Sequence, residues 1–159
     1  MNKHTKVALF VVRVVMGWFF LYAGLTKVLN PAWSAAGALT NARLLPSLYA
    51  WFALPSNIGW INFVNEWGLV LLGVSLILGI GVRFSSLLGA GLMLLYYGAT
   101  AASIAHPTPY TYFVDDHLIY ASILLFFAAS RAGRVYGLEE WCEKLPVCRR
   151  IPGLHRWWG

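Results

Sequence analysis

Residues 7–29 read VALFVVRVVMGWFFLYAGLTKVL, and this stretch decides the fold class. It is an almost continuous apolar run, close in length to the roughly 20 residues that a helix needs to cross a bilayer. The run stops at Asn30-Pro31, and it continues too far beyond Arg13 to be the apolar region of a signal peptide. We therefore predict that it is a membrane-spanning helix of the mature protein.

Three further apolar stretches have the length of a span, at about residues 61–82, 84–105 and 113–129. Hydrophobic residues make up 59% of the chain and charged residues only 11%, whereas a soluble domain averages roughly 25% charged residues. Lipid is the solvent that fits this composition, and the lack of period-two alternation excludes a closed barrel of strands. We predict an all-α integral membrane protein in which residues 1–131 form one four-helix bundle of four spans.

The distribution of lysine and arginine predicts the orientation of the bundle. Positive residues gather at the N-terminus, at Arg83 between the second and third spans, and after the fourth span. The positive-inside rule places these three regions in the cytoplasm. We predict cytoplasmic N- and C-termini, a multi-pass location in the cytoplasmic (inner) membrane, and a basic cytoplasmic tail over 132–159 with Trp141, Trp157 and Trp158. The net charge of +6 arises from these flanks, so the expected partner is the lipid bilayer and not nucleic acid.

The segment between the first two spans is less apolar than the spans themselves. Residues 32–58 contain Pro46 and Pro55, and the stretch Ala35–Ala53 mixes aromatic with polar side chains. This pattern is typical of a short helix, or a pair of helices, that lies in the membrane interface.

Charged residues inside the spans are candidates for function, because a charge at the bilayer centre costs roughly 2.5–3.5 kcal/mol on insertion scales. In the first span, steps of four and three place one set on a single helix face: Arg13, Gly17, Phe20, Gly24 and Lys27. The two glycines allow another helix to approach this face closely. Arg13 is expected roughly 9 Å from the cytoplasmic edge, and Lys27 is expected near the outer edge.

A cluster of polar side chains is predicted in the outer layer of the bundle, walled by apolar and aromatic residues. Its members at a common depth are Lys27, Glu66, Asp116 and His117, to which the third span adds Tyr96, Thr100 and Ser103. Asp115 is expected to be solvated at the end of the fourth span.

Such a cluster suits a small amphipathic ligand, and a quinone has the required polar carbonyls and apolar tail. Glu66 and His117 are the candidate catalytic residues, because both residue types can take up and release protons. The candidate quinone- or substrate-binding residues are Lys27, Tyr22, Asp116, Tyr120, Tyr96 and Arg13. The alternative is structural, since buried charges can fix helix register and Lys27 can extend to the headgroups.

No metal or flavin site is legible in the sequence, so quinone, as a diffusible substrate, is the one cofactor expected. The chain carries no complete zinc-ligand set, Gly-rich phosphate loop or dinucleotide fingerprint. His106 and His117 both fall near the outer end of the spans, which disfavours a haem held between facing helices. Cys142 and Cys148 are expected to be free cytosolic thiols, with a redox pair as the alternative.

Several short motifs resemble those of the DoxX/DoxD family, over about residues 10–140. They are Arg13-x-x-Met16-Gly17 followed by Tyr22-Ala23-Gly24-Leu25-x-Lys27, Glu66-x-Gly68 followed by Gly73 and Gly79-x-Gly81-x-Arg83, Asp116-His117-Leu118-Ile119-Tyr120, and Ala132-Gly133-Arg134-x-Tyr136-Gly137. Within this family the chain resembles the DoxD branch, the larger subunit of thiosulfate:quinone oxidoreductase. The resemblance implies a four-helix membrane subunit that oxidises thiosulfate to tetrathionate and reduces quinone together with a partner subunit, DoxA. No DoxA-like domain is fused here, so a second protein subunit is expected.

Two other functions fit parts of the pattern. A non-catalytic accessory or scaffold subunit of a larger respiratory or photosynthetic membrane complex would explain the glycine-lined helices and the eight tryptophans. A small transporter or channel is disfavoured, because the sequence shows neither an inverted repeat nor a pair of broken helices.

Overall fold

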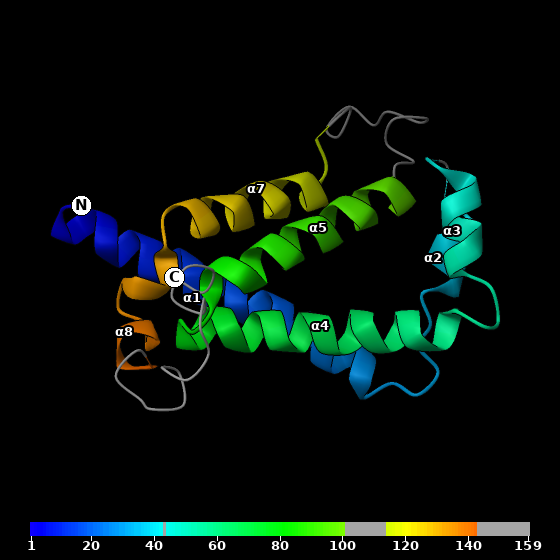
Figure 1. Ribbon diagram of the computed structural model, residues 1–159, viewed down its shortest axis with the longest axis horizontal. Helices are drawn as coiled ribbons and strands as arrows, with labels where there is room; N and C mark the ends of the chain where they lie inside the picture. The colour runs from blue at the N-terminus through cyan, green and yellow to red at the C-terminus, as the bar shows by residue number, and fades with distance from the viewer. Residues whose placement is uncertain (43, 101–113, 143–159) are drawn as a thin grey trace, which may run out of the picture.

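The computed structural model describes residues 1–42, 44–100 and 114–142, and every regular element in these ranges is helical (Figure 1). The elements are α1 (Lys3–Val28), α2 (Ala36–Thr40), α3 (Pro46–Phe52), α4 (Ile58–Leu78), α5 (Val82–Thr100), α7 (Asp116–Ala129), the 3-10 turn η1 (Ala132–Arg134) and α8 (Glu139–Cys142). The predicted all-α class is confirmed for these ranges, and the segment between the first two spans forms the expected pair of short helices, α2 and α3.

Three of the described helices, α1, α4 and α5, are long and apolar enough to cross a membrane. Their 26, 21 and 19 residues extend about 39, 32 and 28 Å, against a hydrocarbon core of about 30 Å. The 14 residues of α7 are equally apolar but extend only about 21 Å. The chain is therefore a multi-pass membrane protein, and a fourth crossing by α7 stays a prediction.

The turn between α4 and α5 comes earlier than predicted. α4 ends at Leu78 instead of near residue 82, because Gly79 and Gly81 adopt left-handed φ angles of 71° and 63°. The hydroxyl of Ser75 holds this turn by donating a hydrogen bond to the carbonyl oxygen of Ile80, at 2.7 Å. The chain thus reverses over residues 79–81, immediately before α5 begins.

α1 and α4 pack antiparallel along a line of glycines. A Cβ atom on Gly24 would lie 2.7 Å from the backbone nitrogen of Val70, and a Cβ atom on Gly73 would lie 2.6 Å from the Cα atom of Leu21. Two backbones come this close only where side chains are absent, and close van der Waals packing is what joins helices in lipid. The glycine-bearing face predicted for the first span therefore does face another helix.

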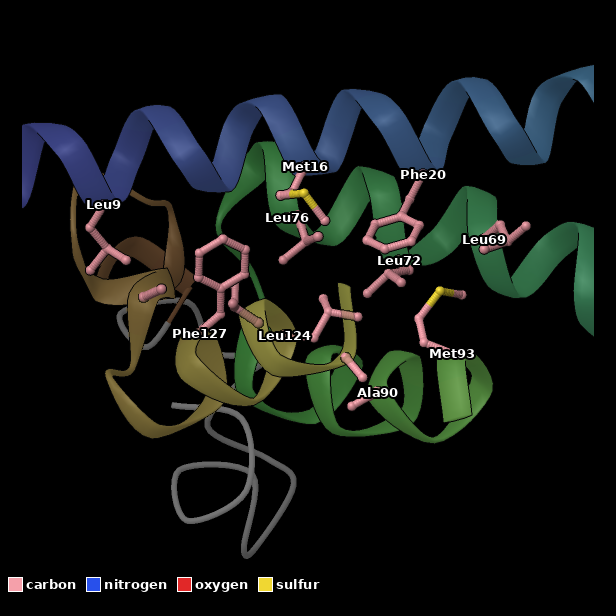
Figure 2. Packing of buried hydrophobic residues seen from close by; sticks show 13 residues of the cluster. Leu9, Met16, Phe20, Leu69, Leu72, Leu76, Ala90, Met93, Leu124 and Phe127 are labelled. Atoms are coloured by element: carbon pink, nitrogen blue, oxygen red, sulfur yellow. The ribbon is translucent and has the colours of Figure 1, made fainter. Parts of the chain in front are cut away.

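The helices α1, α4, α5 and α7 surround one apolar core, in which Met16 and Phe20 of α1 point towards the other three helices (Figure 2). The remaining large members of this core are Leu9, Leu69, Leu72, Leu76, Met93, Leu124 and Phe127. Large apolar side chains also cover the outside of the helices, among them Trp18, Leu71, Leu88 and Phe126. An apolar exterior around an apolar core is stable in lipid, where the hydrophobic effect does not drive helices together.

The described part of the protein has two distinct ends. One end carries the start of α1, the end of α7, η1 and α8, and we call it the amino-terminal end (Figure 1). The opposite end carries α2 and α3, the end of α1 and the start of α4, and we call it the cavity end. Arg13 lies towards the first end and Lys27 towards the second, about 21 Å apart along α1 at the standard helical rise.

Candidate functional site

A cavity of about 440 Å³ opens at the cavity end, where α1, α4, α5 and α7 meet the segment that contains α2 and α3. Most of its wall is apolar or aromatic, with contributions from Trp33, Ala38, Leu39, Phe52, Trp60, Ile61, Val64, Leu92 and Leu95. Its polar lining includes Lys27, Asn65, Tyr96 and His117. Ligand pockets have roughly this size and this excess of apolar wall over a few polar groups.

Three of the polar residues form a hydrogen-bonded chain across the cavity. The Tyr96 hydroxyl donates to Oδ1 of Asn65 at 2.6 Å, and the Lys27 ammonium donates to the Tyr96 hydroxyl oxygen at 3.4 Å. Asn65 is only 7% exposed, and its amide NH₂ group is left as a donor when its oxygen accepts from Tyr96. These hydrogen bonds therefore place a donor from α1, the Lys27 ammonium, and a donor from α4, the Asn65 amide, at the same cavity.

Aromatic rings hold the Lys27 ammonium in place. Its nitrogen lies 5.1 Å from the ring centre of Trp33 and 5.4 Å from that of Tyr96, within range of cation–π attraction. The carboxylate of Glu66 is the acidic group that acts on this ammonium electrostatically. Among the described residues no carboxylate lies within ion-pair distance of Lys27, so its charge is available to a ligand.

A histidine–aspartate pair lies at the start of α7. Nδ1 of His117 lies 2.8 Å from Oδ2 of Asp115, while Oδ1 of the same carboxylate accepts the backbone N–H of Leu118 at 3.1 Å and caps the helix. The imidazole ring stands edge-on to Tyr96, with 5.6 Å between ring centres. The expectation that Asp115 is solvated is wrong, because these contacts leave its side chain only 16% exposed.

The structure brings together some of the predicted site residues. Lys27, Tyr96 and His117 line one cavity, as the predicted cluster requires. Glu66 is partly buried next to Asn65 in α4 and interacts with Lys27 electrostatically, but it is not part of the cavity wall.

Other predicted residues lie elsewhere. Tyr120 packs against the rings of Phe19 and Phe20, with ring centres 4.8 and 6.0 Å away. Tyr22 is 61% exposed on the outside of α1, and Asp116 is exposed in the first turn of α7. Ser103, His106, Cys148, Trp157 and Trp158 lie outside the described residues.

Arg13 lies in a separate, buried cluster near the amino-terminal end. The Arg13 side chain is fully buried, and its guanidinium group donates to the carbonyl oxygen of Ala132, to that of Val135 at 2.9 Å and to that of Tyr136 at 3.3 Å. The carboxylate of Glu139 acts on the same guanidinium electrostatically. These contacts fasten α1 to the turn that follows α7, and they hold Arg13 far from the cavity.

Asn65, Trp33 and Tyr49 were not singled out from the sequence. The Tyr49 hydroxyl, on α3, donates to the carbonyl oxygen of Leu95 at 2.8 Å and so fixes α3 against α5 beside the cavity. Burial raises the pKa of Tyr49, which keeps the phenol in its donating form. A neutral amide inside an apolar span, such as Asn65, is itself a sequence signal of polar contact, whereas Trp33 and Tyr49 lie among the other aromatic residues between the first two spans.

The described residues contain no group of three or more His, Cys, Asp or Glu side chains placed to hold a metal ion. Comparison with protein-family models matches residues 8–106 to the model described as DoxX. No curated protein and no solved structure shows significant similarity to the chain.

Proposed function

The chain belongs to the DoxX family of membrane proteins, and we propose that it is the membrane subunit of a quinone-linked oxidoreductase that binds the quinone ring in the cavity. The observation that carries this proposal is the placement of Lys27, Tyr96 and His117 around one space with apolar walls. As the resemblance to DoxD implies, the electron donor would be thiosulfate and its product tetrathionate.

The cavity matches the chemistry of a quinone. A carbonyl oxygen of the ring is an acceptor, and the Lys27 ammonium and the Asn65 amide are donors that face the same space. The rings of Trp33 and Tyr96 offer flat surfaces for a planar ring. An isoprenoid tail would fit the apolar wall that α3, α4 and α5 provide.

Quinone reduction consumes protons as well as electrons. Two thiosulfate ions, one quinone and two protons give one tetrathionate ion and one quinol, so the site must deliver two protons. His117 lines the cavity and is the nearer candidate proton carrier. Glu66, one residue beyond Asn65, is the second candidate, and its effect on Lys27 couples its charge to the cavity.

A partner subunit would supply the thiosulfate chemistry. The proposal includes four membrane crossings with α7 as the fourth, both termini in the cytoplasm and the cavity towards the outer face of the cytoplasmic membrane. Thiosulfate is a dianion, and the positive charge of Lys27 would favour its approach to this face.

Replacing Lys27 with methionine is expected to raise the Kd for decylubiquinone by at least about 10-fold. The change removes a charged donor, whose hydrogen bond is worth about 1.5–3 kcal/mol, and about 1.4 kcal/mol is a factor of 10. Quenching of tryptophan fluorescence in detergent measures the affinity, because Trp33 and Trp60 line the cavity. Lys6→Met, an exposed position in the same helix, is the matched control.

The same titration distinguishes the competing function. An accessory or scaffold subunit would bind quinone equally well, or not at all, before and after the Lys27→Met change. Equal affinity in Lys27→Met and Lys6→Met would therefore count against a quinone site at Lys27.

A further inference from the structure

The function proposed above uses His117 but assigns no role to the carboxylate that touches it. We propose that Asp115 is a positioning residue, which holds His117 in the tautomer protonated at Nδ1 and thereby makes Nε2 the nitrogen that exchanges a proton with the bound quinone. This inference rests on the proposed function for the identity of the ligand, whereas the tautomer itself follows from the contacts of the pair.

The contact defines which nitrogen carries the proton. An ionised carboxylate can only accept hydrogen bonds, so the 2.8 Å contact with Oδ2 of Asp115 places a proton on Nδ1 of His117. In the neutral ring Nε2 then carries the lone pair. Among the described residues no side chain or backbone group is hydrogen-bonded to Nε2, and the ring lines the cavity.

The carboxylate is itself held in place. Its other oxygen accepts the backbone N–H of Leu118, so the two oxygens are committed to two different groups. The edge-on contact with Tyr96 restrains the imidazole from the side of α5. A histidine fixed in one tautomer by a carboxylate on its far nitrogen is a common way to aim the other nitrogen at a reacting group.

The pair can deliver one of the two protons that quinone reduction requires. The Nε2–H bond of the imidazolium breaks, an O–H bond forms on the ring oxygen, and thiosulfate supplies the electrons through the partner subunit. Asp115 stabilises the imidazolium before the transfer and keeps the proton on Nδ1 after it. The other ionisable side chains of the cavity wall are Lys27 on α1, Tyr49 on α3 and Tyr96 on α5, and Glu66 acts on Lys27 from outside the wall.

Two substitutions separate positioning from helix capping. Asn and Ser both cap helices about as well as Asp, so Asp115→Asn and Asp115→Ser preserve the bond to the N–H of Leu118. Asp115→Asn can present its amide N–H to Nδ1 and so favour the opposite tautomer, whereas Asp115→Ser is too short to reach the ring.

The experiment is ¹⁵N NMR of the histidine-labelled full chain in detergent, with His117 assigned by its loss in His117→Gln. We expect wild-type His117 to carry its proton on Nδ1, and we expect most molecules of Asp115→Asn to carry it on Nε2. An unchanged tautomer in both Asp115→Asn and Asp115→Ser would overturn the positioning role.

A parallel decylubiquinone titration of the wild type tests the proposed function separately. Absence of quinone binding with the expected tautomer present would overturn the proposed function and the proton transfer to quinone, while the tautomer assignment would stand. Quinone binding with a wild-type His117 protonated at Nε2 would overturn the inference alone.

Discussion

Replacing Gly73 with leucine is expected to destabilise the protein strongly and to reduce its folded fraction. A Cβ atom at this position would lie 2.6 Å from the Cα atom of Leu21, and a backbone atom cannot turn aside as a side chain can. α1 would have to move away from α4 along the line that also contains Gly17 and Gly24. Overpacking costs about 1–3 kcal/mol and occasionally more, a large part of a typical stability of about 5–15 kcal/mol. Size-exclusion chromatography of a fluorescent fusion, measured before and after heating, should show a smaller monodisperse peak that is lost at a lower temperature than in the wild type.

Gly91→Leu is the matched control for this experiment. Gly91 is exposed in α5, and a Cβ atom there would meet nothing within 4 Å. Leucine favours both helix formation and lipid, so neither helical propensity nor membrane insertion explains a difference between the two variants. A monodisperse, stable Gly73→Leu protein would show that α1 and α4 do not pack as described.

Replacing Arg13 with methionine is expected to destabilise the protein by about 3–5 kcal/mol, the range found when one partner of a buried charged pair is removed. The guanidinium group donates to three backbone carbonyl oxygens in the turn after α7, and the Glu139 carboxylate acts on it electrostatically. Methionine fills similar space but donates to none of them. Thermal unfolding in detergent, with Lys6→Met as the exposed control on the same helix, measures the loss.

Arg13→Lys keeps the charge and is expected to lose part of the stability, because a single ammonium cannot reproduce the planar fork of donors. Its affinity for decylubiquinone should match that of the wild type, since Arg13 lies about 21 Å from Lys27 along α1. A folded Arg13→Lys protein with weakened quinone binding would contradict the separation of the two clusters.

The sequence predicted the inward face of α1 well. Steps of four and three residues select Arg13, Gly17, Phe20 and Gly24, and all four are buried. The signal is strong because a span with charges and glycines on one stripe has only one face that avoids lipid. The same reasoning placed Lys27 at the end of the helix where the cavity lies.

The directions of side chains on α4 and α7 could not be predicted in the same way. The polar residues of both helices lie mainly near their first residues, and the rest is almost entirely apolar. Because lipid accepts the same apolar residues as the core, little in this part of the sequence marks an outward face. Tyr120 consequently packs on Phe19 and Phe20 instead of lining the cavity, and Asn65 lines the cavity where Glu66 was expected.

The hydrogen-bond acceptors of Arg13 could not be predicted from the sequence either. The sequence counted Arg13 among the candidate quinone-binding residues, although its depth along α1 differs from that of Lys27. Its hydrogen bonds go instead to backbone carbonyl oxygens of residues 132–136. Every residue has a backbone carbonyl oxygen, so the residue types do not indicate which carbonyl groups accept these hydrogen bonds. Only the return of the chain after α7 shows which ones meet the guanidinium group.

Photolabelling of the purified full chain with an azidoquinone, followed by mass spectrometry of the labelled peptides, tests the quinone site most directly. The proposal predicts labels on cavity residues such as Trp33 and Tyr96, which excess decylubiquinone removes and Lys27→Met weakens. Labels confined to the lipid-facing surface around Trp18 and Leu88, or insensitive to competing quinone, would contradict it.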